Sequence, residues 1–425
     1  MNSESNRIEY KQQHTSDVKE LVKILHTSDW HLGRMLYSKK ERSEEHSCFF
    51  EWLLNTIKEN AVDILLVAGD IFDTTSPGNA SLKMYYDFLL KIRDYGCSHV
   101  VIVGGNHDSP SLLDAPKEIL SVLNVKVVGK ACENPEDEVF VLYSENEKPL
   151  AVICAVPFLR ERDISKYIEG ETYSDRSRRI TDCIRKHYEA VAGIAKNKQK
   201  ECGKEVPIIA TGHLSVAGGK TTADDGVRDI YIGNIECIGS EIFPPCFDYV
   251  ALGHYHIPSI ISDSVRYSGS PIPMCFGEAN QQKKVIIVDF ESGNKKITEI
   301  PIPTFRKLES IIGDKDSISA RLQQLKGKDE SVWVEVIYEG GEIFADFATW
   351  TADQTADTKI EVLINKNKTY LDKVLTQEDT TKSLEEMNEY DVFDKLLNSK
   401  DFPDEQKTEL RDLYKEIINE MNEKE

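Results

Sequence analysis

The segment Ile24-Leu25-His26-Thr27-Ser28-Asp29-Trp30-His31 joins an apolar, strand-like run to two side chains that commonly bind metals, Asp29 and His31. The arrangement recurs, and further apolar runs end at Asp70, at Asn106-His107-Asp108, at His213 and at His254-Tyr255-His256. In open α/β sheets, functional groups gather at the carboxyl ends of the strands. The repeated placement therefore predicts one rim that carries two Asp, one Asn and several His side chains. That inventory suits a two-metal hydrolytic centre.

Length and composition limit the class of protein. At 425 residues the chain is too long for one ordinary core, so we expect two or three domains. No apolar run approaches the roughly 18–20 residues that a membrane span needs, and the polar N-terminus lacks the apolar core of a secretory signal. The nine cysteines form no CxxC pair, which is typical of reduced thiols in a cytoplasmic protein rather than of a disulfide frame or zinc ribbon.

The net charge of −21 bears on nucleic-acid binding. A free-standing, non-specific DNA-binding protein is usually basic, because it must neutralise phosphates. Any role with nucleic acid is therefore expected to depend on metals, on a local basic face or on a partner protein.

The first 303 residues predict one large α/β domain behind a polar extension. Residues 1–22 are polar and are expected to lie outside the fold. Over residues 23–303, apolar runs alternate with helix-like stretches such as Glu44–Asn60 and Ala80–Tyr95. Such alternation predicts a layered α/β domain.

The remainder of the chain predicts a small second domain and a helical tail. Residues 304–372 suggest a βαβ-type domain with a helix over Ser317–Leu325 and strands over Val332–Tyr338 and Ile360–Ile364. A polar linker, 373–383, is expected to join this domain to a helix–loop–helix tail, 384–425. Apolar residues recur at helical spacing in the tail, at Leu410, Leu413, Tyr414, Ile417, Ile418 and Met421, and an earlier helix is expected to carry Val392, Phe393, Leu396 and Leu397.

Each candidate ligand has an ordinary structural explanation when it is taken alone. Asp29 could cap a helix, Asp70 could be a turn residue, and Asn106 could belong to a simple Gly-Asn-His turn. The joint pattern, with every motif at a strand end, favours a metal site instead. A carboxylate has two oxygens, so Asp70 can bridge two cations, which a histidine cannot do.

The order of motifs DxH, GDxxD, GNHD, GH and GHxH resembles the calcineurin-like metallophosphoesterase superfamily. The resemblance implies a four-layer α/β/β/α sandwich with a small α+β capping domain and a C-terminal helical tail. It also implies two ligand sets that share Asp70 as the bridge. One metal is expected on Asp29, His31, Asp70 and His256, and the other on Asp70, Asn106, His213 and His254.

Longer motifs resemble the bacterial SbcD-type nucleases, which are counterparts of the eukaryotic and archaeal double-strand-break repair nuclease. These motifs are HTSDWHLG from His26, VAGDIFD from Val67, GNHDS from Gly105, ATGHL from Ala210, VRDIYIG from Val227 and GSPIP from Gly269. The resemblance covers residues 23–303 and is looser beyond them, where the Asp391-Val392-Phe393 stretch supports it.

The resemblance implies a function and partners. It implies a DNA nuclease with 3′-to-5′ double-strand exonuclease and single-strand or hairpin endonuclease activity, acting in DNA repair, replication and recombination. The implied partner is the coiled-coil ATPase SbcC, in a heterotetramer with two copies of each chain. The sequence Gly218-Gly219-Lys220-Thr221 is no Walker motif, so we expect this chain itself to bind no ATP.

The expected chemistry is phosphodiester hydrolysis. Two cations can neutralise the diester and activate a water, and the mixed ligands suit manganese best, with iron or zinc as alternatives. His107 is left over when the ligands are assigned, and it could protonate the leaving oxygen or be merely structural. Asp108 is expected to orient the site. Thr74, rather than Arg, follows Asp73, which favours a diester over a phosphomonoester.

Basic residues could add contacts to the DNA backbone. The candidates are Arg160 with Arg162 and Arg176 with Arg178 and Arg179, for which a solvated helix face is the simpler explanation. Two other functions stay open at this point. One is a cyclic-nucleotide or other small phosphodiesterase, and the other is a non-catalytic adaptor that uses only the capping domain and the tail.

Overall fold

The computed structural model describes one continuous body and a few residues of the tail. The described residues are 21–368, except 167, 169–171, 222–237, 292, 329, 342, 343 and 345, together with 393, 397, 406–408, 410, 411, 413 and 414. The linker, most of the tail and the VRDIYIG motif therefore lie outside the described residues, as do residues 1–20 of the predicted N-terminal extension. The last two residues of that extension, Leu21 and Val22, belong to the first strand of the fold instead. No helix in the described part of the chain is long and apolar enough to cross a membrane.

The first sheet has the strand order β14-β13-β1-β4-β5-β6. Its parallel strands are β1 (Leu21–Thr27), β4 (Ile64–Ala68), β5 (His99–Val103) and β6 (Val125–Val128), and the antiparallel strands β13 (Lys284–Glu291) and β14 (Asn294–Pro301) complete it. The helices between these strands are α1 (Ser43–Asn60), α2 (Asn79–Lys91), α3 (Pro110–Asp114) and α4 (Lys117–Ser121). Because β1 lies between β13 and β4, residues from both ends of the domain meet in this sheet.

The second sheet has the order β11-β12-β10-β9-β8-β7. Its strands are β7 (Val139–Tyr143), β8 (Pro149–Cys154), β9 (Ile208–His213), β10 (Tyr249–Gly253), β11 (Ser259–Ile260) and β12 (Val265–Tyr267). The central strands β8, β9, β10 and β12 are parallel, and the helices are α5 (Glu161–Ile164) and α6 (Tyr173–Glu201). Short 3₁₀ turns cover Ile92–Tyr95, Pro135–Glu138, Ser240–Ile242 and Phe276–Glu278.

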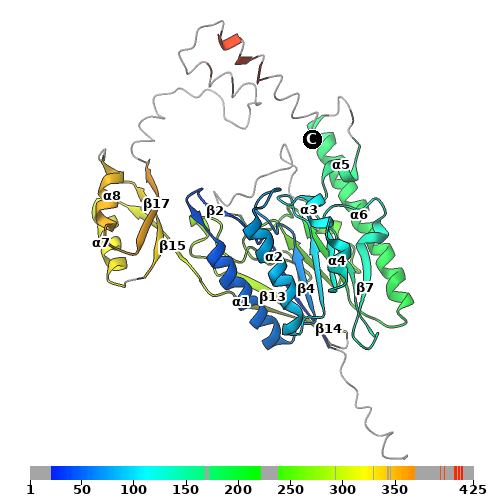
Figure 1. Ribbon diagram of the computed structural model, residues 1–425. Coiled ribbons are helices and arrows are strands. Elements are labelled where there is room, and N and C mark those ends of the chain that lie inside the picture. Colours follow the sequence, from blue (N-terminus) through cyan, green and yellow to red (C-terminus); the bar gives the residue numbers. More distant parts are fainter. Residues whose placement is uncertain are drawn as a thin grey trace, which may run out of the picture.

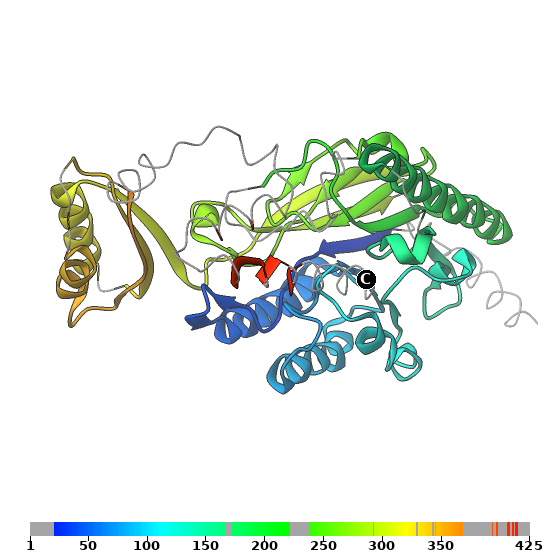
Figure 2. The same cartoon turned by 90° about the horizontal axis from the view of Figure 1, so that it is seen from above.

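The two sheets pack face to face and the helices cover their outer faces (Figures 1 and 2). Between the sheets lies an apolar core that includes Ile24, Leu66 and Val101 from the first sheet and Ile153 and Ala251 from the second. All of β4 is buried because both of its faces are covered, which explains its unbroken apolar sequence. In Figure 2 the blue helices and the green α6 lie on opposite sides of the strands. The predicted four-layer α/β/β/α sandwich is confirmed.

Helical periodicity explains the outer layers. In α1, the residues Phe49, Phe50, Leu53 and Ile57 recur at helical spacing and are buried against the first sheet. In α6, a stripe that includes Ile184, Tyr188 and Val191 packs on the second sheet in the same way.

The capping domain is a three-stranded parallel sheet with two helices, and in Figure 1 it lies to one side of the sandwich. Its elements are β15 (Lys307–Gly313), α7 (Lys315–Lys326), β16 (Val332–Tyr338), α8 (Phe347–Thr355) and β17 (Ile360–Asn367). The sequence interpretation included α7, β16 and β17 but lacked β15 and α8. α8 buries only Phe347 and Thr351, so its sequence carries too weak an apolar stripe to be recognised.

A small hairpin joins the capping domain to the sandwich. It consists of β2 (Met35–Leu36) and β3 (Lys40–Glu41), and it directly follows the first metal-ligand motif. Leu36 and Phe276 from the sandwich form one apolar cluster with Leu308, Trp333 and Leu363 from the capping domain.

Candidate metal centre

Backbone hydrogen bonds join the loops that follow β1 and β4, and they position Asp29, His31 and Asp70. The Asp29 backbone N–H donates to Gly69 O at 3.0 Å, and the His31 N–H donates to Asp70 O at 3.0 Å. All three ligand candidates have positive φ angles, of 53°, 47° and 51°. Non-glycine residues rarely adopt this conformation, and such strain concentrates at functional sites. The backbone therefore bends sharply at each of these side chains.

The loop after β5 carries Asn106 and His107 and is held by Asp108. The buried Asp108 carboxylate accepts hydrogen bonds from the backbone N–H groups of Gly105 (2.8 Å), Phe72 (2.9 Å) and Ile71 (3.1 Å). Burial raises the pKa of Asp108 to about 6. A Cβ atom on Gly105 would lie 2.1 Å from Asp70 Oδ1, so only glycine allows the loop to approach this carboxylate so closely.

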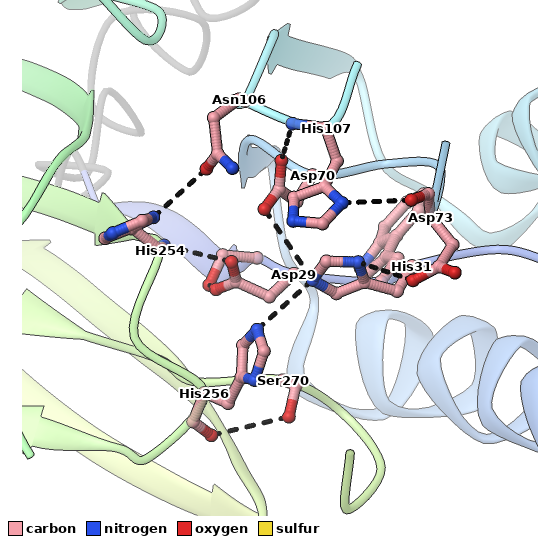
Figure 3. A network of polar contacts seen from close by, with 12 residues as sticks. Asp29, His31, Asp70, Asp73, Asn106, His107, His254, His256 and Ser270 are labelled. Carbon is pink, nitrogen blue, oxygen red and sulfur yellow. Dashed lines mark hydrogen bonds and ion pairs between the residues drawn. The ribbon is translucent and has the colours of Figure 1, made fainter. Parts of the chain in front are cut away.

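The second sheet supplies His213, His254 and His256. His213 Nε2 lies 3.2 Å from Asp70 Oδ2 and 2.9 Å from Asn106 Oδ1. His254 Nδ1 lies 3.1 Å from Asn106 Oδ1, and the His254 backbone N–H donates to Asp29 Oδ1 at 2.9 Å. His256 Nε2 lies 3.2 Å from His31 Nε2. A dashed line marks this contact in Figure 3. The rim predicted from the strand ends thus contains groups from both sheets.

Three overlapping groups within this rim have potential ligand atoms within 4.8 Å of one another. They are Asp29 with His31 and His256, Asp29 with Asp70 and His213, and His31 with Asp70 and His107. Asp29, His31 and Asp70 each belong to two groups. His254 belongs to none of the three, and it approaches the centre through Asn106 instead.

His107 was expected not to bind a metal, but it lies beside two of the ligand candidates, His31 and Asp70. Its backbone N–H donates to Asp70 Oδ1 at 2.9 Å, and its ring meets the His31 ring edge-on at a centroid distance of 4.9 Å. Its Nδ1 lies 2.9 Å from Asp73 O, and because a carbonyl only accepts, that nitrogen carries its proton there.

At pH 7, His31 and His254 are in the neutral form that binds a divalent cation, whereas Asp70 holds His213 in its charged form. Burial lowers the pKa of His31 to about 4 and that of His254 to about 3, so both rings are neutral at pH 7 and offer a lone pair. Burial opposes ionisation of Asp70, but the charge of His213 and its hydrogen bond hold the pKa of this carboxyl well below its usual range. Conversely, Asp70 overcomes the effect of burial and raises the pKa of His213 to about 9.

Two acidic residues behind the histidines were missed by the sequence reasoning. Asp73 Oδ1 lies 3.2 Å from His31 Nδ1 and accepts a 3.0 Å hydrogen bond from Arg34. Glu278 Oε1 lies 3.6 Å from His256 Nδ1, and Glu278 is paired with the buried Lys283. Carboxylates in such positions orient metal-binding imidazoles. The GDxxD spacing could have revealed Asp73, whereas no sequence signal marks Glu278.

Three of the five arginines considered for DNA contact have other roles in the structure. Arg160 Nη2 donates to Gly105 O at 3.2 Å and to Asp108 O at 3.0 Å, so it supports the loop that carries Asn106 and His107. Arg176 and Arg179 pair with Glu161. Two other arginines are largely exposed, Arg162 and Arg178.

Family models match both parts of the chain. Residues 22–258 match the family described as calcineurin-like phosphoesterase. Residues 304–401 match a family named SbcD_C, which is described as the type 5 capsule protein repressor C-terminal domain. The fold and the site therefore define a phosphoesterase of the calcineurin-like class that carries an additional C-terminal domain.

Comparison with individual proteins places the chain within one branch of this family. The SbcD subunit of the nuclease SbcCD from Escherichia coli K12 is 34% identical over 410 residues, which cover 94% of this chain and 98% of the relative. The Bacillus subtilis protein of the same name is 29% identical, covering 74% of this chain and 78% of the relative. The Rhodobacter capsulatus protein of that name is 32% identical, covering 66% of this chain and 69% of the relative. The chain therefore belongs to the calcineurin-like phosphoesterases and, within them, to the family of SbcD subunits of the nuclease SbcCD.

Proposed function

We propose that this chain is the metal-dependent DNA nuclease subunit of an SbcC–SbcD-type complex. One observation carries the proposal. Oxygen and nitrogen ligands from both sheets converge around the buried Asp70, in a chain whose similarity to nuclease subunits extends over nearly its whole length. The substrates would be double-stranded ends, hairpins and single strands of DNA.

The ligand geometry supports two cation sites that share Asp70. One set is Asp29, His31, Asp70 and His256, and the other is Asp70, Asn106, His213 and His254. Carboxylate, amide and imidazole ligands together suit Mn²⁺ best. When bound, two such ions would neutralise the phosphodiester and lower the pKa of a coordinated water.

The side chains around the ligands have separate tasks. Asp73 and Glu278 orient His31 and His256 through their second ring nitrogens. His107 Nδ1 donates a hydrogen bond to the Asp73 carbonyl, so Nε2 is the nitrogen that would protonate the leaving sugar oxygen. This step requires the ring to carry a proton on both nitrogens, and it leaves the proton on Nδ1 in place. Thr74 occupies the position after Asp73 from which an arginine could clamp a monoester, and this favours a diester.

The acidic chain is expected to act with a partner. The named relatives are subunits of SbcCD, and an SbcC-type coiled-coil ATPase would supply DNA affinity that a net charge of −21 disfavours. We assign the docking site to the tail, 384–425, and expect a cytoplasmic, membrane-free heterotetramer that contains a homodimer of this chain.

Cleavage of end-labelled hairpin DNA with Mn²⁺, with and without the ATPase partner and ATP, tests the proposal. We expect metal-dependent opening of the hairpin and stimulation of duplex resection by the partner with ATP. Hydrolysis of a chromogenic diester without any cleavage of DNA, even with the partner present, would favour a small-molecule phosphodiesterase. Absence of bound metal by mass spectrometry would favour a non-catalytic adaptor.

A further inference from the structure

A cavity of about 570 Å³ lies where the capping domain meets the phosphoesterase domain. The sandwich contributes Arg34, Met35, Tyr37 and Met274 to its lining, and β17 of the capping domain contributes Ile364 and Lys366. The volume falls in the range of about 300–1,000 Å³ that is usual for small-ligand sites. The cavity exists only when both domains are present, because each supplies one wall.

The lining combines the two chemistries that a nucleotide needs. Arg34 and Lys366 offer cationic donors for a phosphate, while Met35, Met274 and Tyr37 offer flat or adaptable apolar surface for a base. Arg34 Nη1 donates a hydrogen bond to Asp73, but the buried Nε of Arg34 has no hydrogen-bond partner among the described residues. A buried guanidinium nitrogen without an acceptor is costly, and an anionic ligand would supply one.

The turn that carries Tyr37 is held in an unusual conformation. Tyr37 and Ser38 have φ angles of 50° and 58°, in the left-handed region that favours glycine. The Tyr37 ring stacks on Phe276 at a centroid distance of 5.5 Å, and its hydroxyl accepts a hydrogen bond from Phe276 N at 3.2 Å. Positive φ angles at both central residues are what the tight turn between β2 and β3 requires, and this turn holds an aromatic ring at the cavity wall.

The cavity is connected to the metal centre through two short contacts. Arg34 Nη1 lies 3.0 Å from Asp73 Oδ1, and the same oxygen lies 3.2 Å from His31 Nδ1. A strand whose scissile phosphate lies at the centre would therefore have its neighbouring nucleotide within reach of Arg34.

We propose that this cavity is a nucleotide subsite, which takes the base and phosphate adjacent to the scissile bond of the cleaved strand. This inference rests on the proposed nuclease function and adds a substrate-binding role for Lys366. The Lys366 ammonium forms an ion pair with Glu335 at 3.0 Å, and a cation with three N–H donors can keep this pair while it contacts a phosphate.

The salt dependence of DNA binding tests the contact of Lys366 with a phosphate. The full-length protein is titrated with a fluorescent single strand over a range of salt concentrations, with Ca²⁺ in place of Mn²⁺ to prevent cleavage. Loss of one phosphate contact on a single strand reduces the slope of log K against log salt by about 0.7. We expect this reduction for Lys366→Ala.

Lys368→Ala is the matched control. Lys368 lies two residues further along, is exposed and is also ion-paired, at 2.5 Å to Glu339, but it does not line the cavity. We expect its slope to equal that of the unmodified protein. Equal slopes for all three proteins would overturn the proposed phosphate contact.

Photocrosslinking tests the position of the base. A strand with 5-iodouracil next to the scissile linkage is irradiated on the protein, and the crosslinked peptides are identified by mass spectrometry. We expect crosslinks at Tyr37 or at one of the methionines, Met35 and Met274, and suppression by excess unlabelled strand. Suppression by free thymidine monophosphate at equal concentration would point to a product site and overturn the strand assignment, as would crosslinks outside the lining.

Failure of the subsite and failure of the proposed function can be distinguished. Neither binding measurement requires cleavage, so the slope and the crosslinks decide the subsite even if the protein cuts no DNA. If the unmodified protein cuts hairpins while Lys366→Ala retains its slope, only the subsite is wrong.

Discussion

At the scale of single residues, Asp70 is the group on which the centre depends most. Its Oδ2 contacts His213 and lies 3.6 Å from His31 Nε2, and its Oδ1 accepts a hydrogen bond from the backbone N–H of His107. We predict that Asp70→Asn leaves the fold intact but lowers DNA cleavage at least about a hundredfold, because even the outer partners of metal ligands cost ~10–100-fold when they are lost. Metal content by mass spectrometry should fall together with activity.

An exposed carboxylate provides the control for this variant. Asp87 is ion-paired to Lys83 on the surface of α2, and Asp87→Asn should change neither metal content nor cleavage. If Asp70→Asn kept both metals and near-normal cleavage, Asp70 would not be the bridge.

His107 provides a test that separates chemistry from metal binding. Removal of a general acid lowers the rate by ~10²–10⁴-fold, so we predict such a loss for His107→Leu with both metals still bound. His99→Leu, at the opposite end of β5, should retain activity. Loss of one metal from the His107 variant would instead make His107 a ligand, as its proximity to His31 and Asp70 allows.

Arg160 should act through the loop that it supports. Arg160→Ala removes two hydrogen bonds to the backbone on either side of Asn106 and His107, and we predict a ~10–100-fold loss of cleavage. Because the missing group is a guanidinium, added guanidinium ion should restore part of the activity. The exposed Arg162→Ala should show neither effect. A loss of DNA affinity at unchanged turnover would contradict a supporting role and indicate direct contact with the backbone.

At the scale of elements, strand ends were the most predictable part of the molecule. Each ligand motif lies at the end of an apolar run that forms a buried strand, and neighbouring parallel strands place such motifs on one rim, so sequence alone brings Asp29 and Asp70 together. His213 comes from the second sheet and meets them because the two sheets pack. Contacts between distant segments were not predictable in this way. Arg160 reaches Gly105 because the two sheets pack, and Glu278 reaches His256 because the turn after β12 lies beside the loop after β10. No local pattern encodes either contact.

Trp333 is one of the capping-domain residues that contact the hairpin, and it is the basis of a further prediction. This buried ring contacts the apolar cluster between the domains, and Lys40 and Arg306 lie 5.9 and 5.1 Å from its centroid. We predict that Trp333→Ala lowers the free energy of unfolding by about 3–5 kcal/mol, measured by urea denaturation.

A milder substitution separates the ring from its polar atom. Trp333 Nε1 donates to Glu361 Oε1 at 3.1 Å, and Trp333→Phe should lose only about 1 kcal/mol, because the ring contacts largely remain. Equal losses for the two variants would mean that the hydrogen bond, and not packing, attaches the domain.

At the scale of the whole molecule, the tail should separate cleavage from assembly. The described tail residues include Phe393 and Tyr414, whose rings stack at a centroid distance of 3.9 Å, so the two predicted helical segments contact each other. We predict that deletion of residues 384–425 preserves Mn²⁺-dependent cleavage of short single strands. Co-purification with the ATPase and ATP-stimulated resection of duplexes should be lost.

The deletion also changes the charge of the protein. It removes 14 acidic and 6 basic residues, a net charge of −8 (6 − 14), so affinity for free DNA should rise slightly at low salt. Titration calorimetry with the ATPase provides the check. Unchanged affinity for the ATPase, or unfolding of the truncated chain, would place the tail helices in the core.

The position of β1 between β4 and β13 has a consequence for the newly made protein. Asp29 leaves the ribosome early, but His254 and His256 follow more than two hundred residues later, and β13 must then pair with β1 before the first sheet is complete. A nascent chain therefore lacks part of the ligand set until residue 256 of 425 has been made. The order of translation therefore delays a complete metal centre until more than half of the chain has been made.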